Sequence, residues 1–155
     1  MQLIPITTDQ EEMQDYLRHE FTKSVFETWQ KLYPVWGYNP PWVGFFAVRG
    51  ADTVGVGGFK GPLKNNTVEL AYGTIPEYEG QGVATKICQL LVKAAIEHTP
   101  SVFITARTLP KKCASTRILC KNNFKKQGLV DDPEDGPVWE WLWQGNLKIT
   151  NFAKT

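Results

Sequence analysis

The feature that most constrains this chain is the stretch of residues 68–98, where a β-favouring run leads through a glycine turn into an apolar helical pattern. Residues 68–75 are rich in apolar and β-favouring residues and show no helical period. Gly80 and Gly82 lie in the turn. The apolar positions that recur at helical spacing after it are Val83, Ile87, Leu90, Leu91 and Ala94. The stretch predicts a strand, a tight loop and a helix.

Two glycines at the start of a helix point to an anion-binding loop, because they let the backbone approach a ligand and leave the first helical N–H groups free to bind it. A P-loop requires Gly-Lys-Ser/Thr, whereas Val83 follows Gly82 here. A dinucleotide fingerprint requires a third glycine where Thr85 stands and an acidic residue about twenty positions later, where residues 100–105 contain none. Both of these phosphate-binding motifs are therefore excluded.

The loop Glu79-Gly80-Gln81-Gly82-Val83-Ala84 resembles motif A of the GNAT superfamily of N-acetyltransferases, which reads Arg/Gln-x-x-Gly-x-Gly/Ala. Gly82 and Ala84 match this pattern, and Glu79 stands where the family usually has Arg or Gln. A carboxylate near a pyrophosphate is repulsive. In the family, backbone amides do most of the phosphate binding, so the resemblance survives this departure.

A second block, residues 112–128, is similar to the closing segment of the same family, in the branch of ribosomal-protein (Rim-type) N-terminal acetyltransferases. Ser115, Lys121, Phe124 and Gly128 fall in register with it. Lys112 replaces the usual Asn. Asn123 replaces Gly, a physically mild change because Asn tolerates a left-handed conformation. The resemblance as a whole spans roughly Thr53 to Trp143.

Length and composition indicate one domain covering residues 1–155, since 155 residues with 42% hydrophobic content suffice for one core. The resemblance implies that this domain is acetyltransferase-like. A net charge of +1 gives no nucleic-acid footprint. Three cysteines without a Cys-x-x-Cys pair and two distant histidines predict neither a disulfide framework nor a metal site. No apolar run approaches the roughly 20 residues that span a bilayer. We therefore expect a soluble, cytoplasmic protein that contacts no membrane.

These patterns predict a mixed α/β sheet with helices on both faces. The resemblance implies a GNAT-like, mostly antiparallel central sheet of about six to seven strands flanked by about four helices. The predicted strands are residues 1–6, 43–49, 53–60, 68–75, 101–107, 124–130 and 137–143, and the predicted helices begin near residue 9 and cover 21–32, 83–96 and 110–122. Thr7 and Thr8 are expected to cap the first helix, and Tyr33-Pro34 to end the second. The run 101–107 should pair in parallel with 68–75 through a right-handed crossover.

Residues 33–42 form an aromatic and proline-rich segment that is predicted to be a loop. Such a loop packs as a lid over the core or lines a substrate site, and the sequence leaves both readings open. In the resembled family this region carries much of the acceptor pocket. Trp36, Tyr38 and Trp42 are therefore candidates for its wall.

The resemblance implies that acetyl-coenzyme A is the co-substrate, and that no metal takes part. Its pyrophosphate would lie on the backbone amides of Gly80, Gln81, Gly82, Val83, Ala84 and Thr85. The pantetheine arm would pair like a strand with Thr74 and Ile75, and an N–H near Ile75 would stabilise the developing oxyanion, a contribution of about 3–4 kcal/mol elsewhere.

Three further residues are assigned to catalysis and acceptor binding. Glu69 is the candidate general base, because a carboxylate in a covered strand is expensive unless it is used. The alternative is that Glu69 pairs with a Lys or Arg. Ser115 occupies the position of the family's proton donor to the thiolate, and helix capping is its alternative. Tyr72 either contacts the acceptor or packs in the core.

The sequence thus supports an N-acetyltransferase that transfers acetyl to a primary amine, with a non-catalytic coenzyme A sensor or scaffold as the alternative. The alternative is motivated by Glu79 and Lys112. The acceptor could be a small molecule or a peptide or protein N-terminus. A homodimer through the last strands also remains open.

Overall fold

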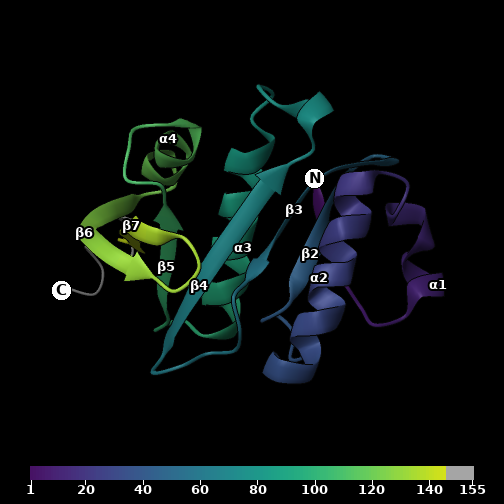
Figure 1. Ribbon diagram of the computed structural model, residues 1–155, viewed down its shortest axis with the longest axis horizontal. Coiled ribbons are helices and arrows are strands. Elements are labelled where there is room, and N and C mark those ends of the chain that lie inside the picture. Colours follow the sequence, from purple (N-terminus) through teal and green to yellow (C-terminus); the bar gives the residue numbers. More distant parts are fainter. Residues whose placement is uncertain (146–155) are drawn as a thin grey trace.

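The computed structural model describes residues 1–145 and contains one seven-stranded sheet in the order β1-β2-β3-β4-β5-β7-β6 (Figure 1). The strands are β1 (Gln2–Pro5), β2 (Gly44–Arg49), β3 (Asp52–Phe59), β4 (Thr67–Thr74), β5 (Phe103–Thr108), β6 (Phe124–Asp132) and β7 (Gly136–Trp143). The pairs are antiparallel except β4 with β5, which are parallel and joined by the expected crossover helix. The mixed, mostly antiparallel sheet is confirmed.

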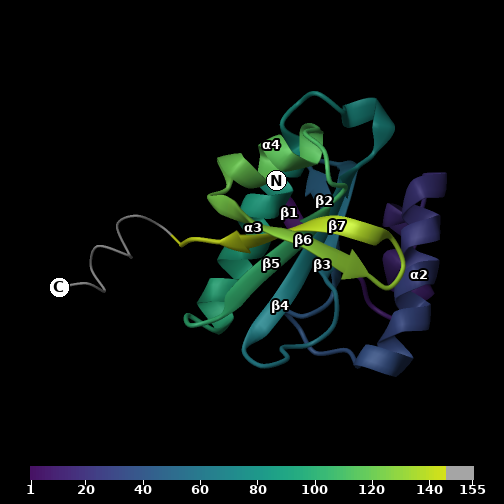
Figure 2. The ribbon, with the colours of Figure 1, turned by 60° about the vertical axis from the view of Figure 1, so that its left-hand side comes forward.

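Four α-helices flank the sheet on both faces (Figure 2). They are α1 (Gln10–Met13), α2 (Glu20–Trp36), α3 (Val83–His98) and α4 (Ala114–Lys121). Strand glycines show which face each helix covers. A Cβ at Gly58 would lie 2.8 Å from Trp29 of α2, whereas a Cβ at Gly57 would lie 2.8 Å from Ile87 of α3. Glycine at these positions lets both helices pack close to β3.

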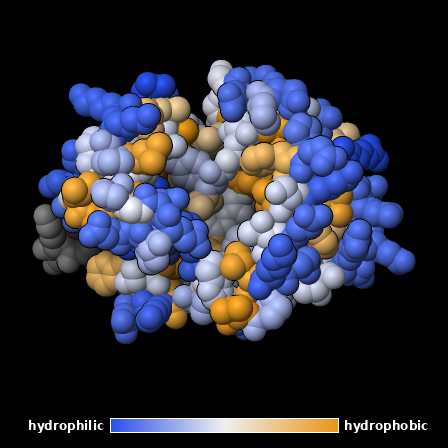
Figure 3. All heavy atoms as spheres, in the orientation of Figure 1, coloured by the Kyte–Doolittle hydropathy of each residue, from blue (hydrophilic) through white to orange (hydrophobic). Residues whose placement is uncertain are grey.

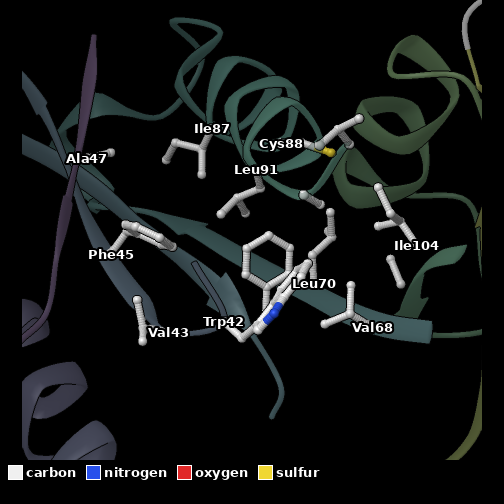
Figure 4. Close-up of a cluster of buried hydrophobic side chains, with 14 of the residues drawn as sticks. Trp42, Val43, Phe45, Ala47, Val68, Leu70, Ile87, Cys88, Leu91 and Ile104 are labelled. Carbon is white, nitrogen blue, oxygen red and sulfur yellow. The ribbon is translucent and has the colours of Figure 1, made fainter. Parts of the chain in front are cut away.

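The largest core cluster lies between the sheet and α3 (Figure 4). Ile87, Cys88 and Leu91 of α3 face Val68 and Leu70 of β4, and all five are buried. The apolar side chains that recur at helical spacing on α3 therefore pack against those that alternate along β4, as the sequence predicts. A second cluster packs Met13 and Phe26 against Phe46 on the opposite face, which is apolar because α1 and α2 cover it.

The parallel pair β4–β5 is short and then opens. Thr67, Val68 and Glu69 pair with Phe103, Ile104 and Thr105, and the pairing ends there although β4 continues to Thr74 and β5 to Thr108. Beyond these residues β4 and β5 do not pair with each other, which leaves a gap in the middle of the sheet. The pairing of β3 with β4 remains regular past Gly73, so the opening lies on the β5 side alone.

The structure corrects three local expectations. Asp9, not Thr7 or Thr8, caps α1, and its Oδ1 accepts the N–H groups of Glu11 and Glu12. Helix α4 begins at Ala114, so residues 110–113 lie outside it, and β6 extends to Asp132.

Helix α2 does not end before Tyr33 but runs through Pro34 to Trp36. A proline inside a helix costs about 3 kcal/mol. Buried contacts offset this cost: the Tyr33 hydroxyl donates to the Ile6 carbonyl at 2.5 Å and accepts the Gly44 N–H at 3.2 Å. Tertiary bonding thus holds a helical turn that local propensity disfavours.

Candidate functional site

The first cavity lies at the N-terminus of α3, between the end of β4 and the start of α4, and has a volume of about 560 Å³. Gly80 and Gly82 adopt φ angles of +78° and +76°, and a side chain at either would meet nothing within 4 Å. The glycines are therefore needed for the left-handed backbone and keep the approach open. The cavity is lined, among others, by Thr74, Gly80, Gly82, Val83, Ala84 and Thr85.

The floor of this cavity offers unpaired backbone donors. The first intrahelical bond of α3 runs from Lys86 N to Gly82 O, so the amides of Val83, Ala84 and Thr85 have no intrahelical acceptor. They carry the positive end of the helix dipole. Arg117 and Lys121 of α4 also line the cavity, as does Glu79. Such a set of donors suits a diphosphate.

Two of the predicted cofactor-binding residues lie elsewhere. The N–H of Ile75 donates to the Val54 carbonyl at 3.0 Å, so it is not free to stabilise an oxyanion as expected. The Gln81 side chain accepts a hydrogen bond from Arg49 at 3.0 Å and does not line the cavity. The Ile75 hydrogen bond removes its N–H from the expected role. The Gln81 bond engages only the side chain, so the role of the Gln81 backbone amide stays a prediction.

Because the Ile75 N–H is engaged, other N–H groups of β4 must face the gap, and the alternating direction of the backbone groups along the strand shows which they are. The Ile75 N–H and the Glu69 carbonyl both bond toward β3. In a strand, successive backbone groups point to opposite edges. The N–H groups of Tyr72 and Thr74 therefore point toward the side where β5 has diverged.

The second cavity lies on the other face of the sheet and has a volume of about 530 Å³. Its floor is the β3–β4 surface, one wall is α2, and the other wall is the turn of residues 132–134 between β6 and β7. Figure 3 shows a hollow in the molecule between these two walls. Tyr72 and Gly73 line both cavities, so the two cavities approach each other beside the gap at β4.

Glu69 lies at the point where the β4–β5 pairing ends, and it lines the second cavity. Its side chain is 19% exposed, with Oε2 3.0 Å from Lys60 Nζ and Oε1 3.7 Å from Arg107 Nε. The pairing that the sequence left open as an alternative is therefore present. Although it is paired, the Glu69 side chain still lines the second cavity beside the gap.

The comparisons with known proteins were made on the sequence and on this fold. Residues 1–125 match the sequence model of the acetyltransferase (GNAT) domain. The chain belongs to the GNAT acetyltransferase family. No curated protein matches the chain in sequence.

Solved structures share this GNAT fold at low identity. A mutant of the spermidine N-acetyltransferase from Vibrio cholerae has a TM-score of 0.68 at 12% identity, covering 92% of this chain and 94% of that one. An aminoglycoside acetyltransferase in complex with coenzyme A has 0.66 at 17%, covering 99% and 98%. A ribosomal-protein-alanine N-acetyltransferase from Brucella melitensis has 0.65 at 13%, covering 92% and 98%. These likenesses establish the fold.

An ion-pair network ties the GNAT sheet together beside the second cavity. Arg107 of β5 bonds Asp132 at 2.9 Å and lies 3.8 Å from Glu140 of β7. The Glu134 N–H, with Arg107 and the Asp135 N–H, lowers the pKa of Asp132 to about 2. The hydrogen bond to Asp132 in turn raises the pKa of Arg107. Arg107 Nε lacks a hydrogen-bond partner within the described residues, although it is buried.

Ser115 and Tyr72 lie together at the α4 edge of the gap. The Tyr72 hydroxyl donates to the Ser115 carbonyl at 3.3 Å. Burial raises the pKa of Tyr72, so its phenol stays protonated at neutral pH. Ser115 lines the first cavity and does not cap α4, because Cys113 is the N-cap and its N–H bonds Thr116 Oγ1 at 3.0 Å.

The three aromatic residues predicted to line the acceptor pocket lie in three different places. Trp36 lines the second cavity. Tyr38 is 41% exposed and packs edge-on against Tyr33, away from both cavities. Trp42 is buried against Phe59 and His98 in the core. Of the three, Trp36 alone lines one of the two cavities, so its role in acceptor binding stays a prediction.

Sequence reasoning missed most of the α2 wall and the acidic turn. Phe21, Val25 and Trp29 recur at helical spacing, but that pattern alone cannot distinguish a core stripe from a cavity wall. Asp132 and Glu134 lie between the last two predicted strands, and nothing local indicates that this segment faces α2.

No helix among residues 1–145 is long and apolar enough to cross a membrane. Nor do those residues contain a group of three or more His, Cys, Asp or Glu side chains placed to hold a metal ion.

Proposed function

We propose that this chain is an N-acetyltransferase that moves an acetyl group from acetyl-coenzyme A to a primary amine. One observation carries the proposal: two cavities on opposite faces of the sheet share Tyr72 and Gly73 of β4, beside the gap where the β4–β5 pairing has ended. A thioester and an amine can therefore reach each other from opposite faces without competing for space. Membership in the GNAT family supports the reaction type.

The residues of the first cavity fit the co-substrate. The free amides of Val83, Ala84 and Thr85 would bind its diphosphate, with Arg117 and Lys121 offsetting the charge of Glu79. Thr74 would bond the pantetheine arm along the open edge of β4, the role first assigned to Thr74 and Ile75 together. Acetyl-coenzyme A supplies the activated acyl group as a thioester.

The residues beside the gap have three tasks. Glu69, directly or through a water, takes a proton from the acceptor ammonium. At pH 7 this deprotonation costs roughly 4–5 kcal/mol for a lysine-like amine, but only about 1 kcal/mol for an α-amine. The Tyr72 N–H polarises the acyl carbonyl in place of the engaged Ile75 N–H. Ser115 gives a proton to the departing sulfur.

Within the family, we propose that the chain is nearest to the Rim-type branch, because residues 112–128 resemble its closing segment. Spermidine and aminoglycoside enzymes share the fold to the same degree. The branch therefore does not name the acceptor.

A second candidate function is a non-catalytic coenzyme A sensor. Glu79 lies in the first cavity, where the family usually has a cation or an amide, and Glu69 is already paired with Lys60 and Arg107. Coenzyme A binding measured by calorimetry, followed by thiol release with an amine panel, separates the two. Binding without turnover of any amine supports the sensor, and absence of binding contradicts both.

Glu69→Gln tests the base. We expect kcat/KM to fall most at neutral pH, by about 100-fold, and less at high pH, where the amine loses its proton without help. Glu97→Gln, which alters an ion-paired carboxylate at the far end of α3, serves as the control. A pH–rate profile of Glu69→Gln parallel to that of the unsubstituted chain would remove Glu69 as base.

A further inference from the structure

The second cavity has one wall that is almost wholly apolar. The cavity-lining side chains of α2 lie four, four, three and four residues apart, which places them on one face of the helix. They are Phe21, Val25, Trp29, Leu32 and Trp36, and the polar residue that lines the cavity with them is Thr28. Three of these five side chains are aromatic. In the orientation of Figure 3, hydrophobic side chains border the hollow on the α2 side.

The facing wall and the floor beside it are acidic. Asp132 and Glu134 lie on the β6–β7 turn, and Glu69 lies on β4 next to the gap. Lys60 is the one cation in this lining, so the described lining carries more negative than positive charge. Glu134 forms no ion pair within residues 1–145. A cation is therefore favoured on this side.

The floor between the two walls is lined by residues with small side chains. Ala71 is exposed on it, and a Cβ at the neighbouring Gly73 would lie 3.4 Å from Phe21. Large side chains at these alternate positions of β4 would fill the space between the strand and α2. The small residues therefore keep open a narrow slot against an aromatic wall.

From this asymmetry we infer that the acceptor is a primary amine carried by an aromatic or similarly flat apolar body. The ring lies between α2 and the floor of Ala71 and Gly73, and the amine lies at the acidic side, beside the gap. The inference rests on the proposed function and specifies its substrate class. A cavity of about 530 Å³ is in the range that holds small molecules.

Other acceptor classes fit this cavity less well. A polyamine or an aminoglycoside would place N–H or hydroxyl groups against the α2 wall, where among the described lining residues only Thr28 offers a side-chain acceptor and the indoles of Trp29 and Trp36 can only donate. Burying those groups without partners is unfavourable. The aromatic wall instead offers ring stacking and apolar burial.

The reaction balances for such an acceptor. The amine nitrogen forms a bond to the acyl carbon, and the carbon–sulfur bond breaks. Protons leave the nitrogen toward Glu69 and the solvent, and the sulfur receives one from Ser115. The products are an N-acetyl arylalkylamine and free coenzyme A.

The test compares amines that differ in one feature. 2-Phenylethylamine and ethylamine share the reacting group and differ by the ring, and spermidine and a peptide with an N-terminal alanine represent the other classes. With acetyl-coenzyme A, we expect kcat/KM for 2-phenylethylamine to exceed that of each other amine at least tenfold. Calorimetry with the coenzyme A-saturated chain adds a readout that needs no turnover.

Two variants locate the ring. Ala71→Leu fills the floor, and Val25→Asp places a charge on the apolar wall. Each should reduce the preference for 2-phenylethylamine over ethylamine by about tenfold, with coenzyme A affinity and the circular dichroism spectrum retained as evidence of folding. Because the two substitutions lie on different elements, failure of one variant to fold leaves the other as the test.

The outcomes separate the inference from the proposed function. Higher kcat/KM for spermidine or the peptide would overturn the aromatic acceptor and leave the acetyltransferase standing. Binding of 2-phenylethylamine without any turnover would support the site and contradict catalysis. If 2-phenylethylamine neither binds nor reacts, the inference is wrong.

Discussion

At the scale of single residues, tertiary hydrogen bonds decide which of several chemically suitable groups are available. Ile75 and Thr74 are neighbours on the same strand end, yet the Ile75 N–H is engaged with Val54 and the Thr74 N–H points toward the gap. Ser115 has the family's position for a proton donor, and Cys113 with Thr116 relieves it of capping α4. Whether a group is free to bind or react therefore depends on hydrogen-bond partners that its local sequence does not reveal.

Ser115→Ala is expected to lower kcat by on the order of 100-fold while the affinity for coenzyme A stays unchanged, because the hydroxyl is needed only when the sulfur departs. Steady-state rates and calorimetry measure the two quantities. Ser24→Ala, on the exposed face of α2, is the matched control. A loss of affinity with an unaltered kcat would assign Ser115 to binding instead.

At the scale of elements, glycines in β3 set how close the helices come to the sheet. A Cβ at Gly57 would lie 2.8 Å from Ile87 and 3.0 Å from Leu91, two fully buried side chains of α3. The position of α3 matters for function because its first turn forms the floor of the first cavity. The packing of α3 against β3 thus positions the backbone amides at the N-terminus of α3.

Gly57→Ala should therefore lower the free energy of unfolding by about 1–2 kcal/mol, since overpacking outweighs the entropy gained from removing a glycine. Urea denaturation measures the change. Gly73→Ala is the control: its Cβ would make an ordinary contact at 3.4 Å, so its stability should stay within about 0.5 kcal/mol. Equal losses for the two variants would contradict this account of α3 packing.

At the scale of the whole molecule, the two halves of the sheet are held together around an opening. The β4–β5 pairing covers only three residues of each strand. Beside it, Arg107 of β5 contacts Glu69 of β4, Asp132 of β6 and Glu140 of β7. This network bridges the strands on both sides of the gap, so the opening can persist without the halves separating.

The network predicts how stability depends on pH. The pKa of Asp132 is about 2 in the folded chain, against an ordinary value of 3.8. Because the folded value is the lower one, the carboxylate stabilises the fold fully above about pH 4, and this contribution is lost as the pH falls toward 2.

Asp132→Asn should consequently flatten the fall in unfolding free energy between about pH 4 and pH 2 and lower stability at neutral pH. Urea titrations at several pH values measure both effects. The adjacent exposed Asp131→Asn provides the comparison, because Asp131 forms no ion pair within the described residues. Identical pH slopes for the unsubstituted chain and Asp132→Asn would contradict the prediction.

Most of the fold could be predicted because its signals are local. The hairpin at residues 50–52 and the parallel crossover from 68–75 to 101–107 follow from periodicity and turn residues that lie within a few positions of each other. The end of α2 could not be predicted, because Tyr33 is held by Ile6 and Gly44.

The sequence by itself determined the order and type of most elements, the glycine turn before α3 and the family, since left-handed glycines and helical spacing act over a few residues. The tertiary structure alone decided that Glu69 meets Lys60 and Arg107, and that an aromatic face of α2 lies opposite the acidic turn. These relations join positions up to about a hundred residues apart along the chain. Only the closing of the sheet brings them together, because no local preference depends on so distant a residue.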